Sequence, residues 1–171
     1  NGMAGEAGHI RLAEDGPVGY GKAGSFEGFC SGGGIAQLGQ VMAEEALDRE
    51  EIPSFCQSKG ELLKVNARTI AEAAEKGDPL ALKIYDIVAD RLGQGLAILV
   101  DLLNPEKIVI GSIFLRQEKL LRQRMEKILN KEALEQSLSV VEVLPAGLGE
   151  KLGDYAAVSV GLRAYQKKQE R

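Results

Sequence analysis

The sequence is poor in the residue types that build metal and redox sites. Its 171 residues include one histidine, two cysteines and no tryptophan. The two cysteines, Cys30 and Cys56, have no paired metal-binding spacing and cannot form a framework of several disulfides. We therefore expect both to be inert thiols in a reducing compartment.

Long apolar runs and blocks of basic residues are missing as well. No uninterrupted apolar run reaches the roughly 18 residues that a membrane-spanning helix needs. The formal charge is −4, from 21 Lys and Arg against 25 Asp and Glu, without a cluster of basic residues, which argues against direct nucleic-acid binding by this chain. With 44% hydrophobic and 27% charged residues, the composition is typical of one globular domain. We expect a cytoplasmic protein that does not contact membranes.

Helix start and stop signals are clearest in the middle of the chain. Asn66 can cap a helix that Gly77 ends, and Asp78 can cap the next one, with Pro79 at its first position. The last turns of this second helix, residues 96–103, are apolar almost all round, which predicts that they are buried in a core.

Short apolar runs alternate with helices in the second half of the chain. The runs "KIVIGS" (107–112) and "SVVEVLP" (139–145) predict two strands, the first of them buried. A charged amphipathic helix is predicted over residues 115–130 between them, and a last helix is predicted to be capped by Asp154. Helices that alternate with short strands predict a layered α/β domain.

Glycine punctuates the first third of the chain. A short strand is predicted over His9–Ala13, followed by a loop and by an amphipathic helix over residues 25–47. The "SGGG" at Ser31–Gly34 should interrupt this helix, because glycine is unfavourable inside one. Gln37 stands where the G-x-G-x-x-G phosphate fingerprint would need a further glycine, so we interpret the segment as a close-packed turn.

Three polar residues near the start form the first candidate binding site. Glu6 and His9 lie in a Gly-rich loop, and a carboxylate beside an imidazole can hydrogen-bond vicinal hydroxyls. Glu27 at the start of the following helix is a third candidate. The alternatives are an ordinary surface loop with a single histidine, and a first-turn carboxylate that the helix dipole favours.

Gly111 and Ser112 form the second candidate. A strand that ends in glycine before a helix places free amides at the carboxyl end of a sheet, where open α/β folds bind ligands. The alternative is one of the many strand-to-helix turns that bind nothing.

Four segments, taken in order, resemble the C-terminal half of the ROK family of bacterial sugar kinases and transcriptional repressors. They are "NGMAGEAGH", "VGYGKAGSFE", the long run from "AAEKGDPLALK" to "NPEKIVIGS", and "LGEKLGDYAAVSVG". The resemblance covers essentially all of residues 1–171. It implies a Ribonuclease H-like (actin-like) ATPase fold of class α/β, of which this chain would be the C-terminal lobe, without the N-terminal ATPase lobe.

The resemblance also implies roles for the candidate residues. Glu6, His9 and Glu27 would bind sugar hydroxyls, and Gly111 and Ser112 would border the adenosine pocket. The family reaction transfers a phosphoryl group from ATP·Mg²⁺ to a hexose hydroxyl, with an aspartate base from the other lobe, so this chain alone is expected to be inactive. Hexoses and N-acetylhexosamines are the expected substrates, and a homodimer is the expected assembly. The alternative function within the family is a sugar-sensing transcriptional repressor.

Two departures from the family pattern matter. The three family cysteines that bind structural zinc align with Val18, Tyr20 and Ser25, and His9 alone cannot hold the metal. We therefore predict no zinc, with Val18 and Tyr20 packing as apolar residues where the metal would lie. In addition, the family usually has consecutive glycines after the strand, whereas this chain has Gly111-Ser112.

Overall fold

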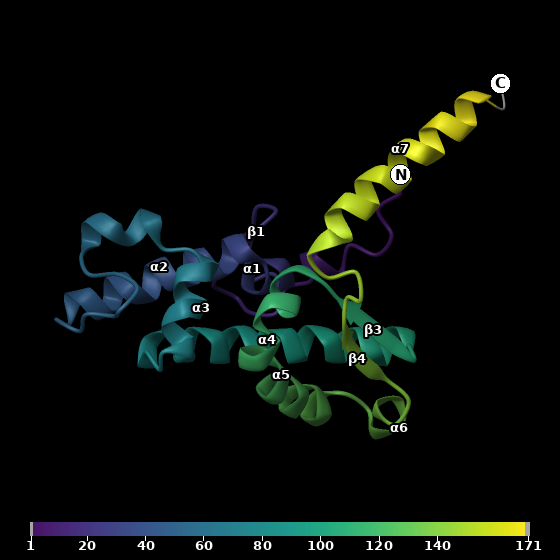
Figure 1. The fold of residues 1–171 in the computed structure, drawn as a ribbon. Helices are drawn as coiled ribbons and strands as arrows, with labels where there is room; N and C mark the ends of the chain where they lie inside the picture. The colour runs from purple at the N-terminus through teal and green to yellow at the C-terminus, as the bar shows by residue number, and fades with distance from the viewer. Residues whose placement is uncertain (1, 170–171) are drawn as a thin grey trace.

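The computed structural model describes residues 2–169, except for the side chains of residues 150, 152, 167 and 168. The elements follow one another along the chain as helices with two short pairs of strands (Figure 1). Their bounds are η1 (Ala7–His9), β1 (Val18–Gly19), β2 (Lys22–Ala23), α1 (Phe26–Cys30), α2 (Gly32–Asp48), η2 (Lys59–Lys64), α3 (Ala67–Glu75), α4 (Pro79–Leu103), β3 (Lys107–Ile110), α5 (Ser112–Glu132), α6 (Glu135–Leu138), β4 (Glu142–Pro145), η3 (Gly149–Lys151) and α7 (Leu152–Gln169).

The long helix α4 is the centre of the fold. Figure 1 shows it between α1, α2 and α3 on one side and α5 on the other. Ile84, Val88 and Leu92, which follow one another at intervals of four residues on one face, are buried in the core. Asp78 caps the helix as predicted and accepts a hydrogen bond from the amide of Ala81 at 2.9 Å. Burial by itself would raise the pKa of Asp78, but the amides of Ala81 and Ser54 outweigh it and hold that pKa below its usual value.

Two glycines let neighbouring helices approach α4 closely from both sides. A Cβ atom on Gly95 would lie 2.5 Å from the ring of Phe26 on α1, and one on Gly93 would lie 2.6 Å from the carbonyl oxygen of Met125 on α5. Contacts this short leave no room for a side chain, so these glycines set the distance from α4 to α1 and to α5. No short sequence pattern indicates this role, because it depends on contacts between separate helices.

The second pair of strands forms a parallel sheet beside the end of α4. Strands β3 and β4 pair with Ile108 opposite Val143 and Ile110 opposite Pro145. Both strands were predicted, but the expectation that the first is buried is wrong, because Val109 is 61% exposed. The end of α4 differs from the prediction in the same way, since Leu102 and Leu103 are exposed. One face of each element packs on the core, and the other faces outward.

The predicted helix over residues 25–47 is interrupted where expected. Ser25 caps α1 and Ser31 caps α2, each by accepting a hydrogen bond from the amide three residues later at 3.1 Å. The strand predicted over His9–Ala13 does not form, because His9 closes the short helix η1 and only Arg11 makes an isolated bridge, to Ser25. Instead of a regular strand ladder, the amides of Leu12 and Ala13 both donate hydrogen bonds to the carbonyl oxygen of Gly24.

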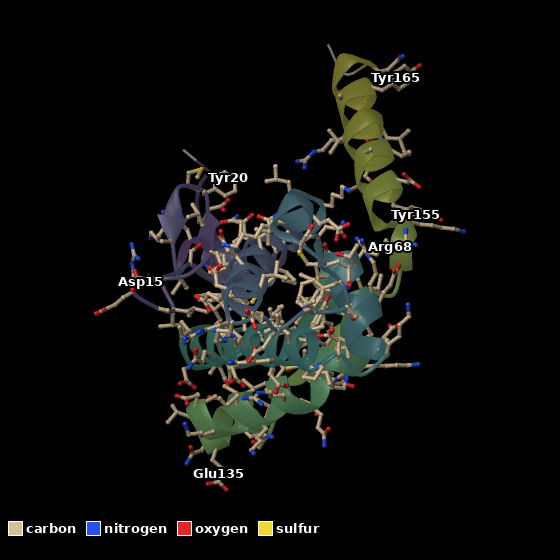
Figure 2. The ribbon with its side chains drawn as sticks, turned by 90° about the vertical axis from the view of Figure 1, so that its left-hand side faces the viewer. Asp15, Tyr20, Arg68, Glu135, Tyr155 and Tyr165 are labelled. Carbon is tan, nitrogen blue, oxygen red and sulfur yellow. The ribbon has the colours of Figure 1, made fainter. Side chains whose placement is uncertain are left out.

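The last helix, α7, points away from the rest of the molecule (Figures 1 and 2). Asp154 lies within its first turn rather than at the cap, which corrects the predicted start. Several of its apolar side chains are exposed, including Tyr155, Val160 and Tyr165. In the part of the chain that the structure describes, none of the helices combines the length and the apolar character needed to cross a membrane.

Candidate functional site

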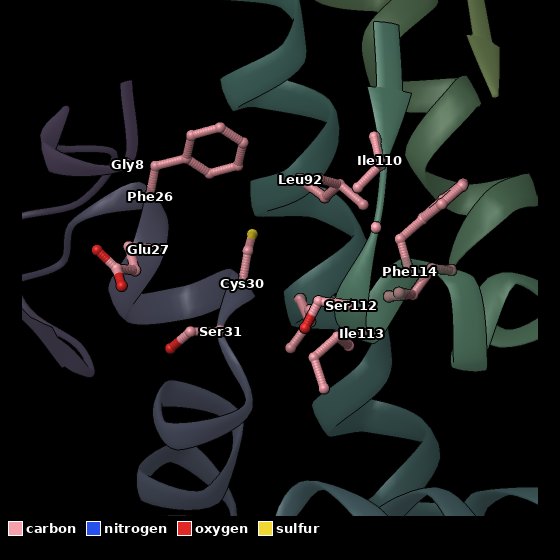
Figure 3. A pocket seen from close by; sticks show the side chains of 13 residues that line it. Gly8, Phe26, Glu27, Cys30, Ser31, Leu92, Ile110, Ser112, Ile113 and Phe114 are labelled. Atoms are coloured by element: carbon pink, nitrogen blue, oxygen red, sulfur yellow. The ribbon is translucent and has the colours of Figure 1, made fainter. Parts of the chain in front are cut away.

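A pocket of about 300 Å³ lies between α1 and the turn that joins β3 to α5. Glu27, Cys30 and Ser31 line one side, and residues 111–114 line the other (Figure 3). Most of the lining is apolar and includes the core residues Val88, Leu92 and Leu121. A mostly apolar pocket with a few polar groups at its edge is the usual form of a small-molecule site.

The segment that carries Glu6 and His9 packs against Glu27 through the backbone of Gly8. Gly8 lies between Glu6 and His9 in the sequence, and a Cβ atom on Gly8 would be 3.2 Å from Cβ of Glu27 and 3.5 Å from its Oε2. The segment therefore packs directly against Glu27, and Gly8 lines the same pocket. The side chains of Glu6 and His9 are exposed and are not among the lining residues, so their contact with a ligand stays a prediction.

Hydrogen bonds fix the backbone around His9. The ammonium group of Lys22 donates to the carbonyl oxygen of His9 at 2.8 Å, and the amide of Phe26 donates to the carbonyl oxygen of Ile10 at 2.8 Å. The first bond ties η1 to the β1–β2 hairpin, and the second ties it to the start of α1. His9 and Glu27 thus belong to segments whose relative position is determined by direct bonds.

Gly111 and Ser112 line the opposite side of this pocket. Gly111 is the residue before α5 and has an extended backbone, and Ser112 opens the helix with φ +54°. Positive φ is the region that glycine adopts without cost, so Ser112 has a glycine-like conformation at the position where the family usually has a second glycine. Glu27 and the Gly111–Ser112 turn therefore line one pocket, whereas the side chains of Glu6 and His9 do not.

Replacing Ser112 with glycine is expected to leave stability unchanged or to raise it by up to about 1 kcal/mol, because glycine relieves the positive φ. Ser112→Val is expected to destabilise the protein by about 2 kcal/mol, since a β-branched side chain is strained there. Urea denaturation of both variants measures the difference. Equal stability of the glycine and valine variants would contradict this backbone conformation.

Among the polar residues that line the pocket, Cys30 and Ser31 were not predicted from the sequence. Burial raises the pKa of the Cys30 thiol, an effect that the nearby Arg91 only partly offsets, so Cys30 contributes a neutral wall. Ser31 caps α2, so the amides of the first turn of this 17-residue helix begin at the pocket. A helix N-terminus favours anions. The sequence signal for this helix start is the serine before three glycines, which also fits a close-packed turn.

The three positions aligned with the zinc cysteines carry Val18, Tyr20 and Ser25, none of which is a usual zinc ligand. Val18 is 47% exposed and Tyr20 is 84% exposed, so the prediction that they pack together as apolar residues is wrong. Ser25 is fully buried, and its hydroxyl accepts a hydrogen bond from the amide of Gly28. Zinc requires nitrogen, sulfur or carboxylate ligands, which these three side chains do not offer. Among the residues whose side chains the structure describes, no group of three or more His, Cys, Asp and Glu residues could hold a metal ion.

Comparison with known sequences finds kinases and repressors. The chain is 30% identical over 163 residues to the Escherichia coli regulator NagC, which covers 92% of the chain and 37% of NagC. It is 30% identical over 166 residues to an Aeropyrum pernix glucokinase (95% and 51%) and 37% identical over 113 residues to a Halalkalibacterium halodurans glucokinase (65% and 33%). The chain thus spans about a third to a half of the length of these curated relatives.

Solved structures give the same two classes. A ROK family glucokinase from Streptomyces griseus, in complex with glucose and AMPPNP, matches with TM-score 0.68 and 27% identity over 86% of the chain and 48% of the kinase. A ROK family regulator homologous to the Escherichia coli MLC protein matches with TM-score 0.66 and 24% identity over 83% and 34%. The fold is therefore the actin-like ATPase fold of these proteins. The ROK family model matches residues 1–161, and the chain belongs to the ROK family.

Proposed function

We propose that the full-length protein is a sugar kinase that transfers a phosphoryl group from ATP to a hexose or N-acetylhexosamine hydroxyl. This chain would supply sugar-binding residues and part of the adenosine site. The observation that carries the proposal is the pocket to which Glu27 contributes on one side and Gly111 and Ser112 on the other. A kinase needs both ligands next to each other, because phosphoryl transfer depends on their alignment.

The chemistry of the residues suits these two roles. The carboxylate of Glu27 can accept hydrogen bonds from sugar hydroxyls, with Glu6 and His9 adding contacts from the neighbouring segment. The first turn of α2 begins at the pocket beside Ser31 and would favour the negative charge of phosphate. Magnesium bound to ATP would neutralise charge on the transferred group. We propose that the aspartate base and further phosphate contacts come from a second lobe of the full-length protein.

Exposed apolar surface supports a second lobe. Val109 on β3 and Val160 and Tyr165 on α7 are exposed, although strands of parallel sheets are usually covered on both faces. Such surfaces are typical of contacts with another part of a protein. In this proposal the chain is the C-terminal lobe of the kinase.

The second candidate function is a sugar-sensing transcriptional repressor. It is favoured by the match to NagC, which covers 92% of the chain at the same 30% identity as the Aeropyrum glucokinase. In a repressor the same pocket would bind an effector sugar, and DNA binding would come from another part of the protein. The two functions predict the same sugar contacts and differ in whether ATP is consumed.

A panel of hexoses and N-acetylhexosamines, each tested with the full-length protein and ATP·Mg²⁺, separates the two functions. A kinase forms ADP only when its sugar is present. Thermal-shift measurements on the same panel detect binding without turnover, because a ligand that binds the folded state raises the melting temperature. ADP formation with one sugar supports the kinase, and a thermal shift without ADP formation supports the repressor. The absence of both would contradict a sugar site.

A further inference from the structure

We infer that the side-chain amide of Gln37 on α2 orders the loop of residues 11–24, which contains the β1–β2 hairpin, so that this loop needs no metal. The loop lies next to residues 6–9, called the sugar-binding segment below because they include Glu6 and His9. Gln37 is a positioning residue in this inference, since it contacts the loop and not the ligand. The inference relies on the proposed function only for its kinetic readout.

Gln37 makes two hydrogen bonds to the backbone of one residue. Its Oε1 accepts from the amide of Val18 at 2.9 Å, and its Nε2 donates to the carbonyl oxygen of Val18 at 3.1 Å. Val18 pairs with Ala23 in the β1–β2 hairpin. The amide of Gln37 therefore binds the hairpin to α2 in the manner of a neighbouring strand.

This contact is made where the family pattern has a zinc ligand. Val18 and Ser25 occupy two of the three positions aligned with cysteines, and each is held by the protein itself. Gln37 holds the backbone of Val18, while the buried Ser25 bonds to the amide of Gly28 at 3.1 Å. A third contact comes from Arg11, whose Nη1 donates to the carbonyl oxygen of Ala23 at 2.8 Å. Protein hydrogen bonds thus anchor both strands of the hairpin and the helix after it.

The hairpin in turn holds the sugar-binding segment. Lys22 on β2 donates to the carbonyl oxygen of His9, and Ser25 starts the helix that carries Glu27. A series of direct bonds therefore leads from Gln37 through the hairpin to His9. Loosening the Gln37 contact should let the segment around His9 move. The Gly111–Ser112 side of the pocket should stay in place, because it follows strand β3, which pairs with β4 and not with the hairpin.

Gln37→Leu in the full-length protein tests the inference, because leucine fills a similar space without either hydrogen bond. Two hydrogen bonds of ordinary net strength correspond to roughly a tenfold change in the local opening equilibrium. Hydrogen exchange of peptides from residues 11–24, measured by mass spectrometry without sugar, is expected to become roughly tenfold faster. Gln37→Glu keeps the acceptor for the Val18 amide but places a carboxylate oxygen against the Val18 carbonyl oxygen, so faster exchange is expected for this variant as well.

The matched control is Gln40→Leu. Gln40 lies one turn further along α2, and its Nε2 donates to the carbonyl oxygen of Val65 at 3.2 Å, away from the hairpin. This variant is expected to leave the exchange of residues 11–24 unchanged. In kinase assays, Gln37→Leu is expected to raise the sugar KM roughly fivefold to tenfold, by the same loss of order, with the KM for ATP unchanged.

Metal analysis completes the test. The wild-type protein is expected to contain no stoichiometric zinc, and chelation is expected to leave the exchange of residues 11–24 unchanged. The inference is overturned if Gln37→Leu exchanges like the wild type, or if chelation removes one zinc per chain and speeds exchange. If the exchange results hold but no sugar binds the wild type, the proposed function fails and the role of Gln37 in the loop stands.

Discussion

Glu27→Gln in the full-length protein is expected to lower kcat/KM for the sugar by roughly 10- to 100-fold. Glutamine keeps the size of the side chain but loses the charge that strengthens a hydrogen bond from a sugar hydroxyl, and such charged bonds contribute about 1.5–3 kcal/mol. The KM for ATP is expected to change little, because Glu27 and the Gly111–Ser112 turn line opposite sides of the pocket. Initial-rate kinetics with each substrate varied in turn measure both effects.

The control is Glu45→Gln, which changes an exposed carboxylate on α2. It is expected to have wild-type kinetics. Glu27 lies in the first turn of α1, where its charge interacts favourably with the helix dipole. Removing this charge is expected to lower the stability by about 0.3–1 kcal/mol, which thermal denaturation of both variants measures. Wild-type kcat/KM for Glu27→Gln, with altered stability only, would leave Glu27 as a structural residue and remove it from the sugar site.

Gly34→Ala is expected to cause the largest loss of stability among single methyl additions in the site region. The new Cβ would overlap the carbonyl oxygen of Gly28, so the junction of α1 and α2 would have to separate. Because the clash is with backbone, the cost should reach about 3 kcal/mol or more, at the upper end for overpacked sites. The midpoint of urea denaturation measures the change, and separation of α1 and α2 should also weaken sugar binding.

Gly33→Ala is the matched control from the same glycine run. A Cβ atom on Gly33 has no neighbour within 4 Å, so alanine is expected to be neutral or to stabilise the protein by up to about 1 kcal/mol through its higher helix propensity. The two substitutions are at neighbouring positions, but only the Cβ atom at position 34 meets the backbone of α1. Equal stability of both would contradict the close packing of α1 against α2.

Local signals in the sequence located most of the long helices and both strands of the parallel sheet, but they placed a strand at His9–Ala13 that does not form and missed the β1–β2 hairpin. The caps at Asn66 and Asp78, the break at Ser31 and the strands around Ile108 and Val143 were all predicted, because each depends on a short stretch of chain. Exposure depends on what lies against an element. For this reason Val109 and the end of α4 were wrongly predicted to be buried, although their apolar character was plain.

The candidate site was predictable in part. A resemblance in motif order indicated Glu27 and the Gly111–Ser112 turn, and the structure places both at one pocket. Three features depend on long-range contacts that no short pattern contains. Gly95 accommodates the ring of Phe26, Ser31 starts α2 at the pocket, and Gln37 binds a residue 19 positions earlier. Each required the three-dimensional arrangement of segments that are separate in the sequence.

The most direct test of a shared pocket is a crystal structure of the full-length protein with its hexose and a non-hydrolysable ATP analogue. We expect the carboxylate of Glu27 about 3 Å from a sugar hydroxyl oxygen, and the nucleoside beside Gly111 and Ser112. A sugar bound away from α1, with the Glu27 carboxylate contacting protein groups only, would contradict the account.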